Sequence, residues 1–535
     1  MKNTGFRAVK WLLAAYLFIT VALPLFLLIG NIRISDVGTV LSSAQFLPML
    51  KNSVLTTLIS TVISVGLSFL LAFCIHRSGI RFKSIWSILF TIPMLIPSIS
   101  HGMGLVLLFG DNGILTNLLG INIGLYGYTG IIMGSVMYSF PVSFLMLSDA
   151  FQYEDYTTYE AAQVLGISKR RQFAAITLPN MRQALVSSLL AVFTMVFTDY
   201  GVPLITGGKI MTLPVYMYRE VVGLMNFSSG AFVGVVLLAP AFIAFLLDLR
   251  KSGSAAAGNL SKSYVVKKNP RRDILAYIVC ICTFIAVCLP ILAFALLSVV
   301  SKYPVNMQLS LENIGKAFSK GAGTYLVNSI TIALLAALVG TILAYFFAYV
   351  TSRTGKTLPN KLLHLLSMIS LAIPGIVLGL SYVFAFKSMP FYSTILILVI
   401  VNIVHFFSSP YLLAYNSLLK MNRNLEDVAD TLGISRFRML CSVYIPSTKE
   451  TIMEMYSYIF VNSMITISAV SFLANFKTMP LALLIPQMEA QSFLEGTAVI
   501  SLVILAVNLL EKLVVFLLHR YSRRLDARES IGRTS

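Results

Sequence analysis

Twelve runs of about 20 apolar residues are the feature that most constrains the fold of this chain. A helix of that length crosses the hydrocarbon core of a bilayer, and the Gly and Pro residues within the runs are tolerated where neighbouring helices satisfy the freed backbone groups. Only 11% of the 535 residues are charged, against roughly 25% in soluble proteins. We therefore predict an all-α polytopic membrane protein, with spans at approximately 11–30, 54–75, 85–109, 124–148, 185–205, 230–248, 274–299, 326–350, 363–386, 392–415, 453–474 and 497–518.

The positive charges are distributed unevenly between the predicted connections. With the N-terminus placed inside, 31 of the 40 Lys and Arg residues fall on inside segments. The positive-inside rule then places both termini in the cytoplasm. The net charge of +19 therefore indicates topology and not nucleic-acid binding. The first run resembles a signal peptide, but its length and the absence of an A-x-A cleavage site favour an uncleaved span.

Motifs that carry chemistry are missing from the sequence. The five cysteines contain no C-x-x-C pair, and no Cys, His and carboxylate cluster has metal-ligand spacing. No G-x-x-x-x-G-K-[ST] motif is present, so the chain cannot hold ATP phosphates in a P-loop. We predict no catalytic residue, no metal and no cofactor.

A collinear series of short motifs recurs at offsets of 266 to 277 residues. The series predicts two homologous six-helix halves, 1–249 and 273–535, with cores at 52–249 and 328–520 and a flexible cytoplasmic linker at 250–272. An even number of spans gives both halves the same orientation, about an axis along the membrane normal. The matched motifs are Asn52-Ser53 with Asn328-Ser329, HRSG (76–79) with SRTG (352–355), Pro97 with Pro374, LGIS (165–168) with LGIS (432–435), TLP (212–214) with TMP (478–480), and Gly230 with Gly496.

Each half contains a polar segment with the pattern of a helix, a tight turn and a second helix, at 152–180 and 421–447. Thr157 and Glu160 fit a capping box, and Gly166 fits a helix stop. The second segment repeats this pattern with Asn424, Asp427, Gly433 and Ser435. A solvated loop is one interpretation. A docking surface for a soluble partner is the other, favoured by the repetition and by the apolar side chains of Ala161, Ala162, Val164 and Leu165.

The first segment resembles the EAA-x3-G-x9-I-x-LP loop of the membrane subunits of binding-protein-dependent ABC importers. The matching residues are Glu160, Ala161, Ala162, Gly166, Ile176, Leu178 and Pro179. The second segment carries a variant with Asp427, Val428, Ala429, Gly433, Val443, Ile445 and Pro446. The Asp427-Val428 departure leaves open whether both loops couple equally.

This resemblance implies the type I importer permease fold and a set of partners. Glu160, Ala161, Ala162, Gly166, Asp427, Val428, Ala429 and Gly433 are then the residues that couple the chain to a separate cytoplasmic ATPase, expected in two copies. The ATPase binds ATP, and its closure turns the halves from inward- to outward-facing. An extracytoplasmic solute-binding protein delivers the solute, and the lipid bilayer of a bacterial plasma (inner) membrane surrounds the chain.

Five residues are candidates for contact with solute. Asp199, next to Tyr200, lies near the outer end of the fifth run, where a carboxylate is costly and is either functional or wetted at a helix end. His101 and His405 are more simply explained as hydrogen-bonded packing residues. Asn462 fits an amide that bonds between helices.

The fused layout resembles permeases for ferric iron, thiamine and 2-aminoethylphosphonate. The segments FTDYGVPLITGG (197–208) and GLMNFSSGA (223–231) most resemble the phosphonate group. An ion-gradient-driven secondary transporter with parallel six-helix repeats remains the main alternative. A membrane enzyme is a second alternative, but it would require a cluster of catalytic side chains.

Overall fold

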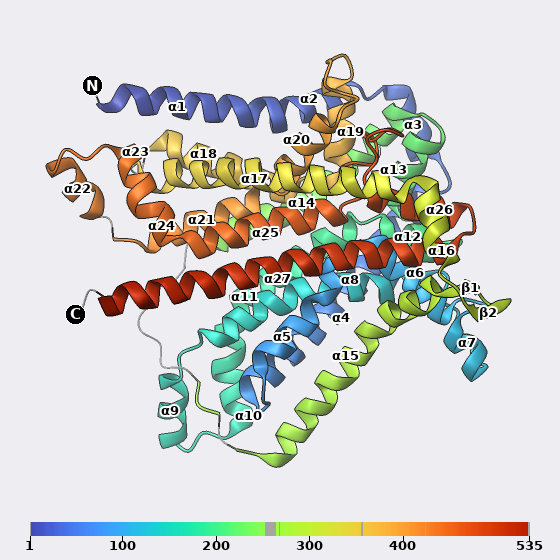
Figure 1. Cartoon of the computed structure of the whole chain (residues 1–535), viewed down its shortest axis with the longest axis horizontal. Helices are drawn as coiled ribbons and strands as arrows, with labels where there is room; N and C mark the ends of the chain where they lie inside the picture. Colours follow the sequence, from blue (N-terminus) through green and yellow to red (C-terminus); the bar gives the residue numbers. More distant parts are fainter. Residues whose placement is uncertain (1, 252–263, 267, 355–356, 423, 533–535) are drawn as a thin grey trace. The chain divides into compact units, whose positions relative to one another are not determined.

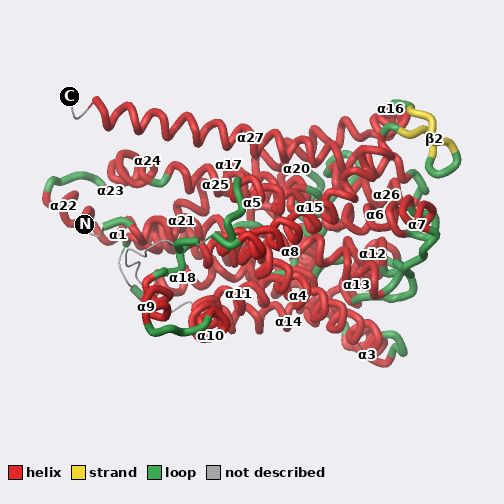
Figure 2. Tube along the Cα trace, turned by 90° about the horizontal axis from the view of Figure 1, so that it is seen from below, coloured by secondary structure: helices red, strands yellow, loops and turns green. Residues whose placement is uncertain are grey.

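The computed structural model describes residues 2–251, 264–266, 268–354, 357–422 and 424–532. Helices make up nearly all of this part of the chain (Figures 1 and 2). Its two strands, β1 (Val300–Lys302) and β2 (Asn306–Leu309), form one antiparallel hairpin that the sequence did not predict. The all-α prediction is confirmed.

The chain forms two compact units, each composed of several chain segments. Unit 1 comprises Met1–Arg33, Ala317–Gln487 and Val503–Ser535, and unit 2 comprises Ile34–Lys316 and Met488–Leu502. The helices of unit 1 are α1 (Lys2–Leu17), α2 (Leu23–Gly30), α17 (Gly323–Arg353), α18 (Leu358–Met368), α19 (Gly375–Phe386), α20 (Ile395–His405), α21 (Ser408–Lys420), α22 (Asn424–Thr431), α23 (Arg436–Met439), α24 (Ile445–Ser447) and α25 (Lys449–Ile465).

Unit 2 contains the hairpin and the remaining complete helices. These are α3 (Ile34–Ser42), α4 (Phe46–Arg77), α5 (Lys83–Thr91), α6 (Ser98–Phe109), α7 (Ile114–Leu119), α8 (Tyr128–Gln152), α9 (Thr157–Val164), α10 (Lys169–Gln172), α11 (Leu178–Phe197), α12 (Gly201–Thr206), α13 (Leu213–Tyr218), α14 (Phe227–Lys251) and α15 (Pro270–Ser298). The chain passes between the units within α16 (Glu312–Ala317), α26 (Leu484–Ala490) and α27 (Leu494–Gly532).

Fewer helices cross a bilayer without a break than the twelve apolar runs predicted. Among the described residues, nine helices are long and apolar enough to span, or up to eleven if each of two bent pairs is one span. The run at 363–386 bends by 108°, at Pro374, because the residue before a proline disfavours helical geometry. The run at 453–474 leaves its helix at Ile465, so α25 has only 17 residues.

The matched Asn-Ser motifs have a structural role in both halves. In unit 2, the Asn52 amide donates to the Met211 carbonyl at 3.1 Å, and the Ser53 hydroxyl accepts from the Leu213 amide at 2.8 Å. Both bonds fasten the TLP segment to the long helix α4. They satisfy backbone groups where the chain is not helical, as a membrane interior requires.

Unit 1 repeats this arrangement on α17. The Asn328 amide donates to the carbonyls of Lys477 and Met479 at 3.0 and 3.2 Å, and Ser329 accepts from the Leu481 amide at 2.7 Å. The motif series along the sequence therefore reflects one packing design used twice.

The two units do not follow the order of the chain. The N-terminal helices α1 and α2 pack against α18 and α19, whereas α15 packs against α4, α5 and α6. The predicted boundaries at 249 and 273 concern sequence repeats, and this division into packed units does not test them. Residues 252–263 and 267 of the predicted linker lie outside the described residues.

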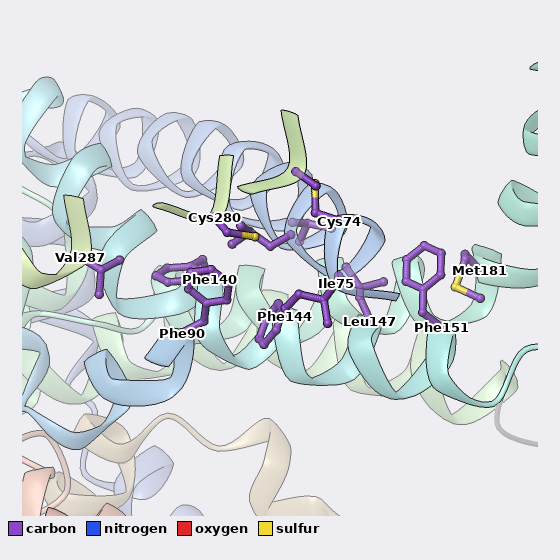
Figure 3. Packing of buried hydrophobic residues seen from close by; sticks show 14 of the residues in the cluster. Cys74, Ile75, Phe90, Phe140, Phe144, Leu147, Phe151, Met181, Cys280 and Val287 are labelled. Atoms are coloured by element: carbon purple, nitrogen blue, oxygen red, sulfur yellow. The ribbon is translucent and has the colours of Figure 1, made fainter. Parts of the chain in front are cut away.

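The core of unit 2 contains a cluster of buried apolar side chains from α4, α5, α8, α11 and α15 (Figure 3). Hydroxyl contacts bring α4 and α8 together beside it: Ser64 and Ser139 lie 2.7 Å apart, and Ser68 donates to the Phe140 carbonyl at 2.8 Å. Small residues of this kind let membrane helices approach closely. Cys280 and Val287 of α15 complete the cluster, so α15 is integral to this unit.

The contact between α6 and α15 predicts the effect of a single methyl group. A Cβ on Gly104 would lie 2.5 Å from Pro290 Cβ, so Gly104→Ala should cost about 1–3 kcal/mol of stability through overpacking. Thermal unfolding of the purified protein measures this loss. Gly66→Ala on α4 is the control, since nothing lies within 4 Å of its Cβ position. If both variants melt like the wild type, the close packing of α15 is wrong.

Candidate functional site

The first predicted loop (152–180) forms the expected pair of helices, α9 and α10. Gly166 ends α9 in the left-handed region with φ +67°. The Ile167 amide then bonds to the Ala162 carbonyl at 2.9 Å, which closes the helix end. The predicted helix stop at Gly166 therefore has its expected conformation.

The second loop (421–447) has the same turn between α22 and α23. Gly433 has φ +66°, and the Ile434 amide bonds to the Ala429 carbonyl at 2.8 Å. Ser435 caps α23, since its hydroxyl accepts from the Arg438 amide at 3.2 Å. The two loops therefore share one backbone design.

The predicted capping box in the first loop is wrong. The Thr157 amide bonds to the Asp155 carboxylate at 3.1 Å, and the Thr157 hydroxyl donates to the same side chain. Tyr156 occupies the N-cap position and makes no side-chain cap bond. An acidic residue two positions before Thr157 therefore replaces the role expected for Glu160.

The predicted coupling residues lie on both sides of the short helices. Ala162 and Ala429 are buried against their own units. Glu160 is half-buried, whereas Ala161, Gly166, Asp427, Val428 and Gly433 are exposed. The alternation gives each loop one face that packs inward and one that faces outward.

A buried ion pair fastens the first loop to α4. Arg77, the last residue of α4, donates through Nη2 to Glu154, and the two side chains have only 4% and 2% exposure. Tyr159 of α9 donates to Glu154 at 2.5 Å and lies 2.7 Å from the Thr177 hydroxyl. Asn180 of α11 also donates to Glu154, at 3.1 Å. We call this network the first clamp.

A second clamp fastens the second loop to α17. Arg353 is the last residue of α17, with 1% of its side chain exposed, and its Nε lies 2.6 Å from Glu426 Oε1. Tyr444 donates to the same carboxylate at 2.5 Å. Burial raises the pKa of the Tyr444 phenol to about 12, so it remains a neutral donor to the carboxylate at physiological pH.

The clamps lie at equivalent helix ends in the two halves, but their carboxylate and phenol come from positions that do not align. At the offset of 267 residues that aligns the LGIS motifs, Tyr159 corresponds to Glu426 and Thr177 to Tyr444. Glu154 itself aligns with Met421, so the carboxylate and the phenol of the second clamp stand at other positions than those of the first. The sequence interpretation missed both clamps because it assigned Arg77 and Arg353 to topology alone. Arg77 and Arg353 occupy matched positions in the repeated motifs HRSG and SRTG, and this repetition could have indicated a shared structural role.

Asp199 lies partly buried in unit 2, and its carboxylate accepts hydrogen bonds from a side chain and two backbone amides. It accepts from the Ser98 hydroxyl at 2.6 Å and from the amides of Gly201 and Val202 at 3.3 and 3.0 Å, at the start of α12. Tyr200 is buried beside it and stacks on Tyr218 at 4.7 Å. Asp199 therefore connects the start of α12 to the start of α6.

A small polar cavity adjoins Asp199 and has room for about one water molecule. Thr57, Ser135 and Thr212 contribute to its wall. The cavity is too small for a solute. No group of side chains with metal-ligand geometry occurs in the part of the chain that the structure describes.

The other solute candidates make local contacts. His101 is buried, with Nε2 at 3.1 Å from the Pro93 carbonyl, and its Nδ1 has no partner among the described residues. His405 packs against Phe406 at 4.5 Å between ring centroids. Asn462 donates to the Tyr458 carbonyl of its own helix at 2.8 Å, and not to a neighbouring helix as the sequence suggested. Contact of these residues with solute stays a prediction.

Comparison with known proteins identifies what both repeats have in common. The sequence model of the family described as "Binding-protein-dependent transport system inner membrane component" matches residues 64–249 and again 340–524. The two matches place one family domain in each predicted half.

Several relatives are similar over most of the chain. The putative ferric transport system permease protein FbpB 1 of Haemophilus influenzae is 26% identical over 463 residues, 83% of this chain and 73% of the relative. The Fe(3+)-transport system permease protein FbpB 2 of the same species is 23% identical over 528 residues, 95% and 97% of the two chains. A spermidine/putrescine transport system permease protein PotC homolog of Mycoplasma pneumoniae is 27% identical over 208 residues, 39% of this chain and 70% of the relative.

The second clamp generates a stability prediction. Arg353→Met should cost about 3 kcal/mol or more, because it leaves Glu426 as a largely buried charge without its cation. Thermal unfolding of the purified protein checks this. The matched control is Arg436→Met, since Arg436 is 36% exposed and its pair with Asp430 is 3.4 Å long; the control should change stability by less than about 0.5 kcal/mol. Equal melting temperatures for the two variants would refute the anchoring role.

Proposed function

The chain belongs to the family of binding-protein-dependent transport system inner membrane components, and from this premise we propose that it forms the translocation pathway of an ABC importer. It is a transport subunit without catalytic chemistry of its own. Energy reaches it through the two loops, which dock on a separate cytoplasmic ATPase that binds and hydrolyses ATP.

The outward face of the first loop supports docking. Val164 is 88% exposed at the end of α9, next to the exposed Leu165, whereas Ala162 on the opposite face is 3% exposed. Burying one such aliphatic side chain contributes about 2 kcal/mol. A short helix that keeps branched apolar side chains in water is better explained by a protein partner than by a solvated loop.

The second loop offers a similar face. Val428, Leu432 and Phe437 are exposed on α22, its turn and α23. Two docking faces of one backbone design suit two copies of an ATPase. The face of the second loop includes Val428 itself and an aromatic side chain, Phe437.

The clamps supply the mechanical link that coupling requires. Each one fixes a loop to the end of a long core helix of its half, α4 through Arg77 and α17 through Arg353. Because buried ion pairs with several hydrogen bonds hold a defined geometry, a displacement of the loop passes to the helix. This rigid link is the observation that carries the proposal.

The charge distribution supports an orientation with both loops and both termini in the cytoplasm. The opposite ends of the helices then face the outside. A solute-binding protein would deliver its ligand there. The copy number of each partner remains part of the proposal.

Ferric iron is the first solute to test. Three relatives that cover most of the chain are named as ferric or Fe(3+) transport permeases. The phosphonate group suggested by FTDYGVPLITGG is not supported by these relatives. Binding of Fe(III) and of 2-aminoethylphosphonate to the cognate binding protein, measured by calorimetry, separates the two. Tight binding of the phosphonate without Fe(III) binding would contradict the iron assignment.

A substitution at the Gly166 turn tests whether the first loop docks on the ATPase. Gly166→Trp should leave the protein folded but reduce stimulation of the cognate ATPase at least tenfold, because a strained, bulky turn misplaces α9, at a cost of about 1–2 kcal/mol. The rate of ATP hydrolysis in proteoliposomes measures it. Gly120→Trp is the control, with the same left-handed backbone (φ +66°) and the same open surroundings, after α7. Unchanged stimulation by the Gly166 variant would reject docking at the first loop.

A further inference from the structure

We infer that Tyr264, in the segment that joins the two halves, is a positioning residue for the first loop. Its ring lies on the Arg77 guanidinium and holds the first clamp closed. The inference rests on the proposed function, because the loop that Tyr264 positions is the one proposed to dock on the ATPase.

The first clamp has a deficit of hydrogen-bond acceptors. Nη1 of Arg77 is buried and has no hydrogen-bond partner among the described residues, although Nη2 is paired with Glu154. An arginine cannot become neutral at accessible pH. A buried donor that lacks an acceptor costs about 1–3 kcal/mol. Another interaction must therefore offset the cost of burying this guanidinium.

Aromatic rings lie around the guanidinium. The Arg77 Cζ lies 3.4 Å from the centroid of Tyr264, against 5.2 Å for Tyr159 and 5.5 Å for Phe151. Tyr264 is therefore in direct van der Waals contact over the charge. A cation–π contact of this kind contributes about 2 kcal/mol when it is shielded from water, which offsets the missing hydrogen bond.

The same ring contacts the beginning of α9. Tyr264 meets Tyr156 edge-to-face at 4.9 Å between centroids and Tyr159 at 5.2 Å. Tyr156 is the N-cap residue of α9, and Tyr159 donates to Glu154. One side chain thus touches the end of α4 and the first turn of α9 together.

Neighbouring contacts anchor the same segment of chain. The Gly79 amide donates to Asp273 at 2.8 Å, and the Arg81 amide donates to the Tyr277 hydroxyl at 2.8 Å. The turn after Arg77 is therefore fastened to the start of α15. Tyr264 lies six residues before α15 begins at Pro270, so these anchors keep it near the clamp.

The second clamp needs no such ring from another segment. Nη1 of Arg353 donates to the carbonyls of Leu418 and Met421 at 3.3 and 3.1 Å, and Nη2 donates to the Asn422 carbonyl at 2.8 Å. Tyr444 of the same loop provides the aromatic contact, at 5.0 Å. Among the described residues, only the first loop is contacted by the chain between the halves, which makes that connection part of the coupling apparatus.

Two substitutions separate the π-contact from simple filling of space. Tyr264→Phe keeps the ring, whereas Tyr264→Leu keeps apolar volume without a π-face. Tyr153→Leu is the control, since Tyr153 lies on the same loop but is 72% exposed. Hydrogen exchange of the α9 amides is measured on the full chain in lipid nanodiscs without an ATPase. We expect about tenfold faster exchange in Tyr264→Leu, with wild-type rates for Tyr264→Phe and Tyr153→Leu.

A second measurement connects this result to coupling. With the cognate ATPase added, Tyr264→Leu should lose most of the stimulation and Tyr264→Phe should retain it. Wild-type exchange in Tyr264→Leu, or equal loss of stimulation in both Tyr264 variants, would overturn the inference. If instead the wild-type chain stimulates no ATPase, the proposed function fails, while the exchange rates still decide whether Tyr264 holds α9.

Discussion

A buried guanidinium at the end of a long helix is the interaction on which the arrangement of each loop depends. Arg77 and Arg353 have 4% and 1% of their side chains exposed. A charge in that position is tolerated only when a carboxylate and further polar groups surround it. The groups that meet this requirement come from the loop itself: Glu154 and Tyr159 in one half, Glu426 and Tyr444 in the other. Satisfying the charge therefore fixes the loop on the helix.

Much of this architecture could be predicted from the sequence because the responsible constraints are local. Apolar run length predicts helices in lipid, and Gly166 and Gly433 end helices because their turns require a positive φ. The recurring Asn-Ser motifs also had a physical cause, since they hold the segments that follow Met211 and Lys477. Several runs were misjudged as single straight spans. The helices break at Pro97 and Pro374, bend between His405 and Ser408, and end at Ile465, against the apolar pattern.

The clamps could not be predicted, because their parts are distant in sequence and stand at positions that do not align between the halves. Glu154 lies 77 residues from Arg77, and its counterpart Glu426 aligns with a tyrosine. The hydrogen-bond partners of Asp199 could not be predicted from the sequence either. A carboxylate in an apolar region is energetically unfavourable, and this made Asp199 a candidate for contact with solute. In the structure, its carboxylate instead accepts hydrogen bonds from the Ser98 hydroxyl and two backbone amides. A buried carboxylate indicates polar neighbours, and which neighbours these are is decided by tertiary packing.

The two loops share a backbone but differ in what holds them, and this difference gives the connection between the halves a role beyond tethering. The central claim, that ATP hydrolysis by a partner moves this chain through its loops, is tested most directly in proteoliposomes. Solute uptake is measured with the binding protein present, once with the ATPase and ATP and once with an ion gradient alone. The account predicts uptake only in the first case. Uptake on an ion gradient without the ATPase would contradict it and would favour a secondary transporter.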